Sequence, residues 1–287
     1  MGFFDRLKSP AATSSRARVI SFLNQKGGVG KTTMAFNTAH ALASRGHKVL
    51  CLDMDPQANL SLLFGIETTS YQLHHLLVNS VRELKALHVP ALVDDLLVRG
   101  KVDLLPSGQE LSGFELTVAG IQGARQLILK LFLEKSGLLD RYDFILIDCP
   151  PTLGLLVVNA LCATHGVMVP FRPDEFSLKG LVHLGDVLAN IEEMGVSETP
   201  QVIAYIPNLV DLRRKQEEDD LEKIRLHLAR ELGHSKLTTP FQNKASLVKS
   251  QAQKKSVFDY QSKEFAPLQA NFSEMVDLIQ EWSDARN

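Results

Sequence analysis

Two lysines lie in one glycine-rich stretch, Asn24 to Thr33, which reads NQKGGVGKTT. The glycines allow the backbone to turn its N–H groups toward an anion, and a lysine followed by threonine supplies a positive charge and a hydroxyl for Mg²⁺. This is the chemistry of a loop that holds the phosphate tail of a nucleotide. Such a loop needs one lysine at the phosphates, so the other, Lys26, requires its own explanation.

The end of this stretch, GKTT, fits the usual phosphate-loop pattern. Lys31 is placed near the β- and γ-phosphates, and Thr32 is placed to hold Mg²⁺. Gln25 stands where the usual pattern has its first glycine. Because a predicted strand precedes the loop and a predicted helix follows it, a chance glycine-rich turn is the weaker interpretation. The expected nucleotide contacts are Lys26, Gly27, Gly28, Val29, Gly30, Lys31, Thr32 and Thr33.

Aspartates follow two further apolar runs. Asp53 and Asp55 end the run KVLCLDMD, and Asp148 ends FILID. In an open α/β sheet the carboxyl ends of the strands face the ligand. Alone, the first pair would more often form a turn or a helix cap. Beside a phosphate loop these carboxylates predict a catalytic site, and Asp148 fits a residue that holds Mg²⁺ through water.

The stretch K-G-G-V-G-K-T-T resembles the deviant Walker A motif of the ParA/MinD family of ATPases, and D-x-D-P-Q-x-N at Asp53–Asn59 resembles the second signature of that family. The similarity is closest to small chromosomal-type ParA partition proteins and runs from Arg18 to Trp282. It implies a homodimer that sandwiches two ATP molecules with Mg²⁺. In that dimer Lys26 would reach the nucleotide of the partner, which explains the second lysine.

The resemblance also assigns roles. Lys26, Lys31 and Asp55 are expected to be catalytic, with Asp55 orienting the attacking water. The residues expected to hold Mg²⁺ are Thr32, Asp53 and Asp148. The family reads the adenine near the ends of the later strands, where Asn208 and Pro240 stand in this chain; ordinary loop residues are an equal alternative there.

A basic stretch, Lys236–Lys255, holds five lysines and no acid, and Arg213–Lys215 is a second cluster. Lysines without interleaved aromatic residues suit contact with a phosphate backbone, although a charge run is often only a solvated face. The run SQAQKKSVFDY resembles the C-terminal region of ParA proteins, which implies binding to non-specific DNA. The family often carries arginine at Ser246 and an acid at Lys249. The expected DNA contacts are Arg213, Arg214, Lys244, Lys249, Lys254 and Lys255.

Short apolar runs alternate with helical patterns along the chain, which predicts an α/β fold: a doubly wound, mostly parallel sheet with helices on both faces. We expect one ATPase domain over 18–287 after a flexible tail, 1–17. The expected strands are Arg18–Asn24, Lys48–Asp55, Lys101–Ser107, Phe144–Pro150, Gly166–Phe171 and Gln201–Asn208. The expected helices include Thr32–Ser44, Gly123–Leu139, Leu155–Ala163, Ser177–Met194, Arg213–Leu232 and Phe265–Trp282.

The composition of the chain limits which partners it can bind and which compartment it can occupy. The net charge of −2 means that nucleic-acid binding must come from a local patch. The three cysteines form no C-x-x-C pair, so buried reduced thiols in a cytosolic protein are expected. The resemblance to ParA proteins implies that this cytoplasmic protein is nucleoid-associated. No apolar run approaches the roughly 20 residues of a membrane span. The last helix is acidic on its polar positions, unlike the basic membrane helix of MinD-type proteins.

Together with the residues of the phosphate site, the resemblance implies a slow, Mg²⁺-dependent ParA-type ATPase that partitions chromosomes or plasmids. Its dimer would bind non-specific DNA, and a ParB-like partner would stimulate hydrolysis. One alternative is a MinD-like positioning ATPase on a membrane, anchored through Phe3, Phe4 and Leu7. Others are ParA-like positioning of a protein cargo and a non-catalytic scaffold that keeps nucleotide as a structural ligand.

Overall fold

The fold was determined as a computed structural model, which places most of the chain. The described residues are 16–67, 73–82, 89–121, 123–195, 197–211, 213–231, 237–242 and 244–286. The predicted anchor residues Phe3, Phe4 and Leu7, and most of the predicted tail, lie outside this part of the chain. Within it, Ala17 is buried and its N–H donates to the carbonyl oxygen of Leu139 at 2.7 Å.

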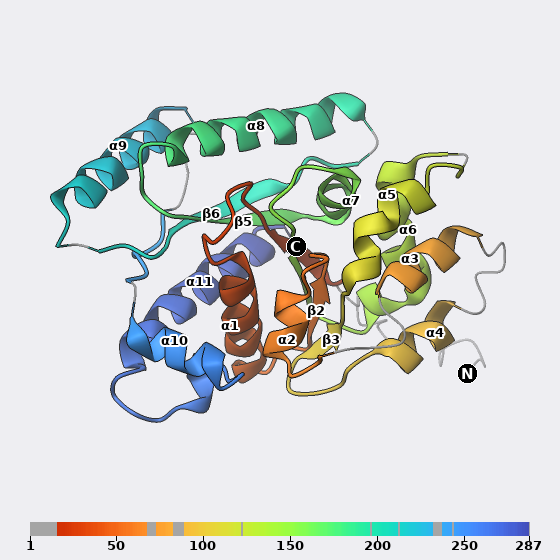
Figure 1. The fold of residues 1–287 in the computed structure, drawn as a ribbon, viewed down its shortest axis with the longest axis horizontal. Helices are drawn as coiled ribbons and strands as arrows, with labels where there is room; N and C mark the ends of the chain where they lie inside the picture. The colour runs from red at the N-terminus through yellow and green to blue at the C-terminus, as the bar shows by residue number, and fades with distance from the viewer. Residues whose placement is uncertain are drawn as a thin grey trace, which may run out of the picture.

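A single six-stranded sheet forms the centre of the molecule (Figure 1). Its strands are ordered β3-β2-β4-β1-β5-β6, and every neighbouring pair is parallel. The predicted α/β fold with a parallel sheet is confirmed, and each predicted strand is present. Their bounds are β1 Arg18–Phe22, β2 Val49–Asp53, β3 Asp103–Leu105, β4 Phe144–Asp148, β5 Gly166–Phe171 and β6 Gln201–Pro207.

Both faces of the sheet are buried, because alternate residues of each strand point to opposite sides. On β2, Leu50 and Leu52 join one apolar cluster, whereas Val49 and Cys51 join the other. This explains why the strands read as continuous apolar runs rather than alternating ones. All three cysteines are free and buried, as predicted.

The helices divide between the two faces. Residues of α1 (Lys31–Ser44), α2 (Asn59–Leu63), α10 (Ala245–Ala252) and α11 (Ala266–Asp284) pack into one cluster. The other cluster takes residues of α3 (Leu73–Arg82), α4 (Val89–Leu96), α5 (Phe114–Thr117), α6 (Ile128–Ser136), α7 (Leu155–Ala163), α8 (Ser177–Met194) and α9 (Lys215–Glu231). Figure 1 shows α8 and α9 beyond β5 and β6, and α1 beside α10 and α11.

Several helix boundaries differ from the predictions. The predicted helix Gly123–Leu139 is divided into 3-10 turns around α6, where Gly137 adopts a left-handed φ of 73° and ends it. Leu232, the predicted end of the Arg213 helix, lies outside the described residues. Helix α10 was not predicted, because its sequence, ASLVKSQA, shows a weak apolar periodicity. Among the described residues, no helix combines the length and the apolar character that crossing a membrane requires.

Candidate active site

The carboxyl ends of three neighbouring strands bring the predicted acids to the glycine-rich loop. Strand β4 lies between β2 and β1, and Asp148 pairs in register with Asp53 on one side and Phe22 on the other. The loop begins directly after Phe22. Helix α1 leaves β1 over one face of the sheet and α7 leaves β4 over the other, which opens a crevice at the strand ends.

The loop itself depends on Gly30. This residue has a φ of 92°, in the left-handed region that side chains disfavour. A Cβ built there would meet the Nδ2 atom of Asn208 at 2.3 Å. That same Nδ2 donates to the carbonyl oxygen of Val29 at 2.8 Å. Asn208, which follows β6, therefore holds the loop in place through its hydrogen bond to Val29. Helix α1 begins directly after Gly30.

The ammonium group of Lys31 is held inside the loop. Only 7% of the residue is exposed, and Nζ donates to the carbonyl oxygen of Lys26 at 3.3 Å. Burial lowers the pKa of Lys31, and the nearby carboxylates of Asp148 and Asp55 oppose that shift. A buried cation among acids is positioned to bind a polyanion without reorganising first.

A cavity of about 550 Å³ lies between this loop and α2. Four of the predicted phosphate-binding and catalytic features meet there: the glycines, Lys31, the threonines and Asp55. The lining residues are Gly27, Gly28, Gly30, Lys31, Thr32, Thr33, Asp55, Gln57, Asn59, Leu62, Leu63, Pro151 and Gln251. Sequence reasoning assigned no role at the cavity to Leu62, Leu63 or Gln251. Gln251 lies in the run SQAQKKSVFDY, which pointed to DNA rather than to the nucleotide.

Asp148 is a fully buried carboxylate at the end of β4. Neither oxygen has a hydrogen bond of good geometry to another described residue. Burial raises its pKa well above the usual range and Asp53 adds to this, whereas the nearby Thr32 hydroxyl and Lys31 lower it. Such an orphaned carboxylate beside a hydroxyl fits a Mg²⁺ ion, which takes one or two protein ligands together with phosphates and waters. The described residues hold no cluster of three or more acidic, histidine or cysteine ligands.

Asp53 is engaged differently. Its Oδ2 accepts from the backbone N–H and the hydroxyl of Ser61 at 2.8 and 2.7 Å, and its Oδ1 accepts from the N–H of Asp55 at 3.2 Å. Burial raises the pKa of Asp53 to about 6, although these hydrogen bonds act in the opposite direction. In this structure Asp53 anchors α2, and its expected place beside Mg²⁺ stays a prediction.

Asp55 faces the cavity from the turn between β2 and α2. It is 8% exposed, and its Oδ1 accepts from the backbone N–H of Gln57 at 3.0 Å. Asp55 is also among the residues that line the cavity. Its geometry suits a residue that orients a water molecule, which is the role the sequence predicts.

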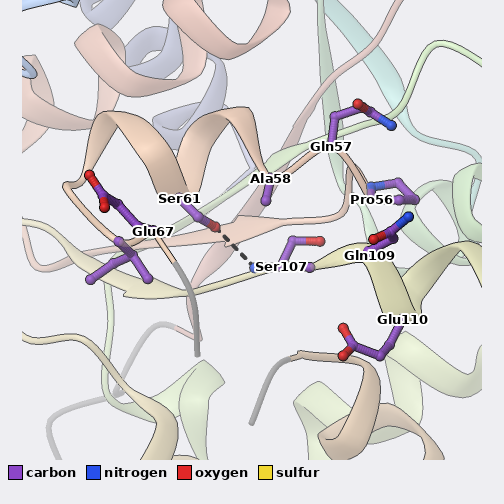
Figure 2. A pocket seen from close by; sticks show the side chains of 10 residues that line it. Pro56, Gln57, Ala58, Ser61, Glu67, Ser107, Gln109 and Glu110 are labelled. Atoms are coloured by element: carbon purple, nitrogen blue, oxygen red, sulfur yellow. Dashed lines mark hydrogen bonds between the residues drawn. The ribbon is translucent and has the colours of Figure 1, made fainter. Parts of the chain in front are cut away.

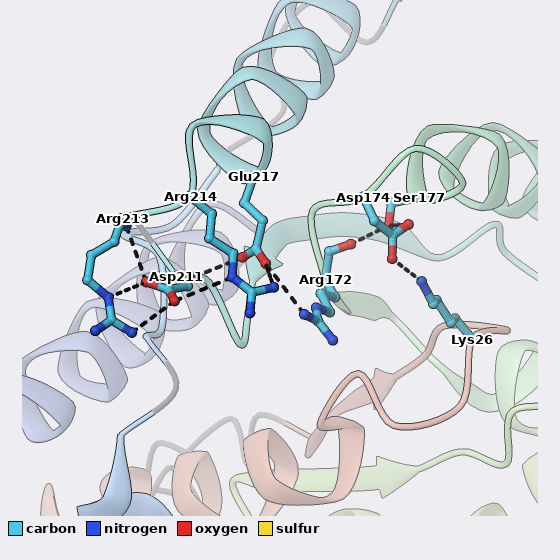
Figure 3. A network of polar contacts seen from close by, with 8 residues as sticks. All are labelled: Lys26, Arg172, Asp174, Ser177, Asp211, Arg213, Arg214 and Glu217. Carbon is cyan, nitrogen blue, oxygen red and sulfur yellow. Dashed lines mark hydrogen bonds and ion pairs between the residues drawn. The ribbon is translucent and has the colours of Figure 1, made fainter.

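Lys26 does not contact the cavity of its own chain. Its ammonium group forms an ion pair with Asp174, which follows β5, and both side chains are partly exposed (Figure 3). Asp174 also accepts from the hydroxyl of Ser177 at 2.9 Å and the N–H of Phe176 at 3.2 Å. Burial raises the pKa of Asp174, but the hydrogen bonds from Lys26 and Ser177 outweigh this, so the pKa lies below its ordinary value.

The two residues expected near the adenine are not among those that line the cavity. Asn208 contacts the loop backbone, as described above. Pro240 lies where the chain returns to the end of β6: its carbonyl oxygen accepts from Asn271 at 3.2 Å, and the N–H of Phe241 donates to Pro207 at 2.8 Å. Their predicted adenine contacts stay predictions.

A second polar pocket, also about 550 Å³, lies between the segment Pro56–Glu67 and the loop after β3 (Figure 2). Gln57 lines both pockets. The Ser61 hydroxyl, which donates to Asp53, accepts from the N–H of Ser107 at 3.0 Å. Through this chain of bonds the loop after β3 is tied to the acid at the end of β2.

The six predicted DNA-binding cations lie just before α9 and within or next to α10. A bridge between Val210 and Gln242 joins the chain before α9 to the chain before α10. Four of the cations form ion pairs: Arg213 with Asp211, Arg214 with Asp211 and Glu217, Lys249 with Glu264, and Lys254 with Glu67. Figure 3 shows the two arginines against Asp211 and Glu217. The first lysine of the basic stretch, Lys236, lies outside the described residues.

Comparisons place this arrangement among known proteins. Residues 17–200 match the family model described as an AAA domain. The chain is 39% identical over 188 residues to an uncharacterized protein of Mycobacterium tuberculosis, covering 64% of this chain and 56% of that protein. It is 35% identical over 217 residues to the chromosome partitioning protein ParA of Caulobacter vibrioides, covering 73% of this chain and 76% of that one.

Solved structures share the fold. The crystal structure of cobyrinic acid a,c-diamide synthase from Mycobacterium smegmatis, with a bound ATP analog and magnesium, superposes with a TM-score of 0.74 at 27% identity. The alignment covers 93% of this chain and 95% of that one. By contrast, this chain spans little more than half the length of the mycobacterial sequence relative, 56% of it.

Proposed function

Because this chain belongs to the ParA family of AAA-domain ATPases, we propose that it hydrolyses ATP in a cycle that positions a cargo on DNA. The observation that carries the proposal is a cavity at the glycine loop that Lys31, Thr32 and Asp55 line. The orphaned carboxylate of Asp148 is buried close to Lys31 and Thr32. The cargo is a chromosome by analogy with the chromosome partitioning relative, and a plasmid is the other cargo that the sequence resemblance implies.

The chain binds the triphosphate through the loop backbone, the N-terminus of α1 and Lys31. Thr32 and Asp148 would hold Mg²⁺, which would supply charge compensation for the phosphates. Asp55 orients the attacking water, and the buried Lys31 stabilises the charge that develops. With no strong general base at the cavity among the described residues, intrinsic turnover is slow.

Lys26 serves the nucleotide of a second copy of this chain. Support comes from its placement: it lies on the phosphate loop, yet its ammonium group points to Asp174 rather than into the cavity of its own chain. Burying a triphosphate between two subunits requires neutralising charge. A lysine donated across the interface makes the dimer depend on ATP.

The dimer binds non-specific DNA through Arg213, Arg214 and the lysines of the α10 region, and a ParB-like protein stimulates hydrolysis and release. The test is co-sedimentation with duplex DNA and with liposomes, in ATP, ADP and no nucleotide, together with a turnover assay. DNA binding that requires ATP and is lost in Lys31→Ala supports the proposal. ATP-dependent liposome binding without DNA binding would favour the membrane alternative, and binding of ATP without any turnover would favour the scaffold.

A further inference from the structure

The segment Gln251–Val257, which we call the lysine turn, is fixed to α1 at both of its ends. At the first end, the side-chain amide of Gln251 donates to the hydroxyl of Thr33. At the other end, the backbone N–H of Val257 donates to Oδ1 of Asn37 at 2.9 Å. The turn therefore spans the first two helical turns of the helix that begins at the phosphate loop.

The two anchor points on α1 are themselves joined. Nδ2 of Asn37 donates to the carbonyl oxygen of Thr33 at 3.0 Å, and Asn37 is fully buried. Residues four apart lie on the same face of a helix. A displacement of Thr33 should therefore move both ends of the lysine turn.

The turn holds Lys254 and Lys255 in defined positions. Lys254 adopts a φ of 52°, a left-handed conformation that a non-glycine residue takes only when its surroundings impose it. The N–H of Lys254 donates to Gln251 at 2.9 Å, and that of Lys255 donates to Ser250 at 3.0 Å. Both lysines are among the predicted DNA contacts, and both are exposed.

Gln251 belongs to the phosphate cavity as well as to the turn. It lines the cavity together with Lys31 and Thr33, although it is separated from Thr33 by 218 positions. A glutamine amide nitrogen carries two N–H groups, and the bond to Thr33 uses one of them. The other is available for an anionic oxygen in the cavity, and a hydrogen bond to a charged acceptor is among the stronger ones.

We propose that Gln251 couples the two ligands of this protein: a phosphate oxygen of the bound nucleotide accepts its second N–H, and this contact sets the lysine turn for the DNA backbone. The inference rests on the proposed function and deepens it. Occupancy of the cavity and affinity for DNA are then linked within one chain, in addition to any effect of dimerisation. Linkage requires the effect to be reciprocal, because both ligands bias the same element.

The experiment measures this linkage directly. Dissociation constants for a fluorescent duplex are determined with and without a saturating non-hydrolysable ATP analogue, and those for a fluorescent ATP analogue with and without saturating duplex. For each ligand, we take the ratio of its dissociation constant without the other ligand to that with the other ligand. In the wild-type chain the two ratios should be equal and greater than one. In Gln251→Ala both ratios should fall by the same factor, about 3- to 10-fold, which corresponds to one hydrogen bond.

Gln253→Ala is the matched control. Gln253 lies in the same turn, but its side chain is exposed and accepts from the hydroxyl of Tyr260 at 2.6 Å rather than contacting α1. Its ratios should equal those of the wild type. Thermal unfolding and light scattering with the ATP analogue should show that Gln251→Ala folds and dimerises.

The outcomes separate the inference from the function beneath it. If the wild type shows ATP-stimulated DNA binding and Gln251→Ala keeps the same ratios, the inference is wrong and the function stands, whatever the absolute affinities. An equal fall in affinity with and without nucleotide would show that Gln251 merely supports the fold of the turn. Loss of the ATP-induced dimer would place the coupling at the interface and overturn the inference. A wild-type chain that binds ATP but no duplex would overturn both.

Discussion

Replacing Asp174 by asparagine tests whether Lys26 is held back from a partner subunit. The substitution removes the charge that pairs with Lys26 and leaves an oxygen to accept from Ser177 and Phe176. The start of α8 is thereby preserved. If Lys26 must leave Asp174 before it can reach a second nucleotide, the variant should dimerise more readily with ATP than the wild type.

The expected gain in dimer affinity follows from how exposed the ion pair between Lys26 and Asp174 is. The side chains of Lys26 and Asp174 are 42% and 31% exposed, and ion pairs of this kind contribute about 0.2–1 kcal/mol. Two pairs break for each dimer, so the gain is about 0.4–2 kcal/mol, or about 2- to 30-fold in the dimer dissociation constant. Because the pKa of Asp174 is lowered, the pair is lost only as the pH falls through that lowered value. The gain should therefore be constant between pH 6 and 8 and should shrink at high salt.

Sedimentation velocity over a concentration series, with a non-hydrolysable ATP analogue and Mg²⁺, measures the dimer constant. Asp186→Asn on the same helix is the control, because its side chain is 70% exposed and lies near His183 rather than Lys26. Lys26→Gln should weaken the dimer, and adding Asp174→Asn to it should give no further change. An Asp174→Asn variant that dimerises no better than the wild type would refute the reasoning.

Four further variants probe the cavity. Lys31→Ala should abolish ATP binding, measured by fluorescence with a labelled nucleotide; retained binding would contradict the role of the buried ammonium group. Asp55→Ala should trap an ATP-bound dimer on DNA with turnover lost, and normal turnover would count against the assignment. Gly30→Ala should destabilise the fold by about 1–3 kcal/mol in urea unfolding and impair ATP binding, because its Cβ meets Asn208 at 2.3 Å and its φ is 92°. Burial raises the pKa of Asp53 to about 6 and also raises the pKa of the neighbouring Asp148, so the ligand-free protein should lose stability as the pH rises above about 4. Urea unfolding across this pH range should show a smaller loss for Asp53→Asn than for the wild type.

The sheet and the phosphate loop were predictable because their signals are local. Strands buried on both faces read as unbroken apolar runs, so their existence and parallel arrangement followed directly. The positions of Asp53 and Asp148 followed too, since parallel strands end at one edge of the sheet. No local signal revealed the ion pair of Lys26 with Asp174, whose partners are 148 positions apart. Such contacts depend on how the loops after β1 and β5 pack.

The contacts of Asn208 and Gln251 could not be predicted from the sequence for a related reason. Asn208 was expected at the adenine, but a strand-end amide can turn either toward a ligand or toward the neighbouring backbone, and here it contacts Val29. Gln251 lies in a basic stretch whose obvious property is charge. Its contact with Thr33 exists only because α10 packs against α1, and neither element carries a motif that pairs it with the other.

The charge pattern of the basic surface bears on how DNA binding would be switched. Each ion pair that a cation makes within the chain competes with a DNA phosphate, and most of the predicted contacts are paired in this way, including Arg213 and Lys249. Among the described residues, Lys244 and Lys255 have no such ion pair.

Phosphate contacts contribute to DNA affinity through the release of counterions, and the affinity rises steeply with the number of these contacts. A single chain with few uncompensated cations and a net charge of −2 would hold DNA weakly. Doubling those cations in a dimer raises the number of contacts without any new contact chemistry. The proposed ATP-dependent dimer would therefore bind DNA more tightly than a single chain.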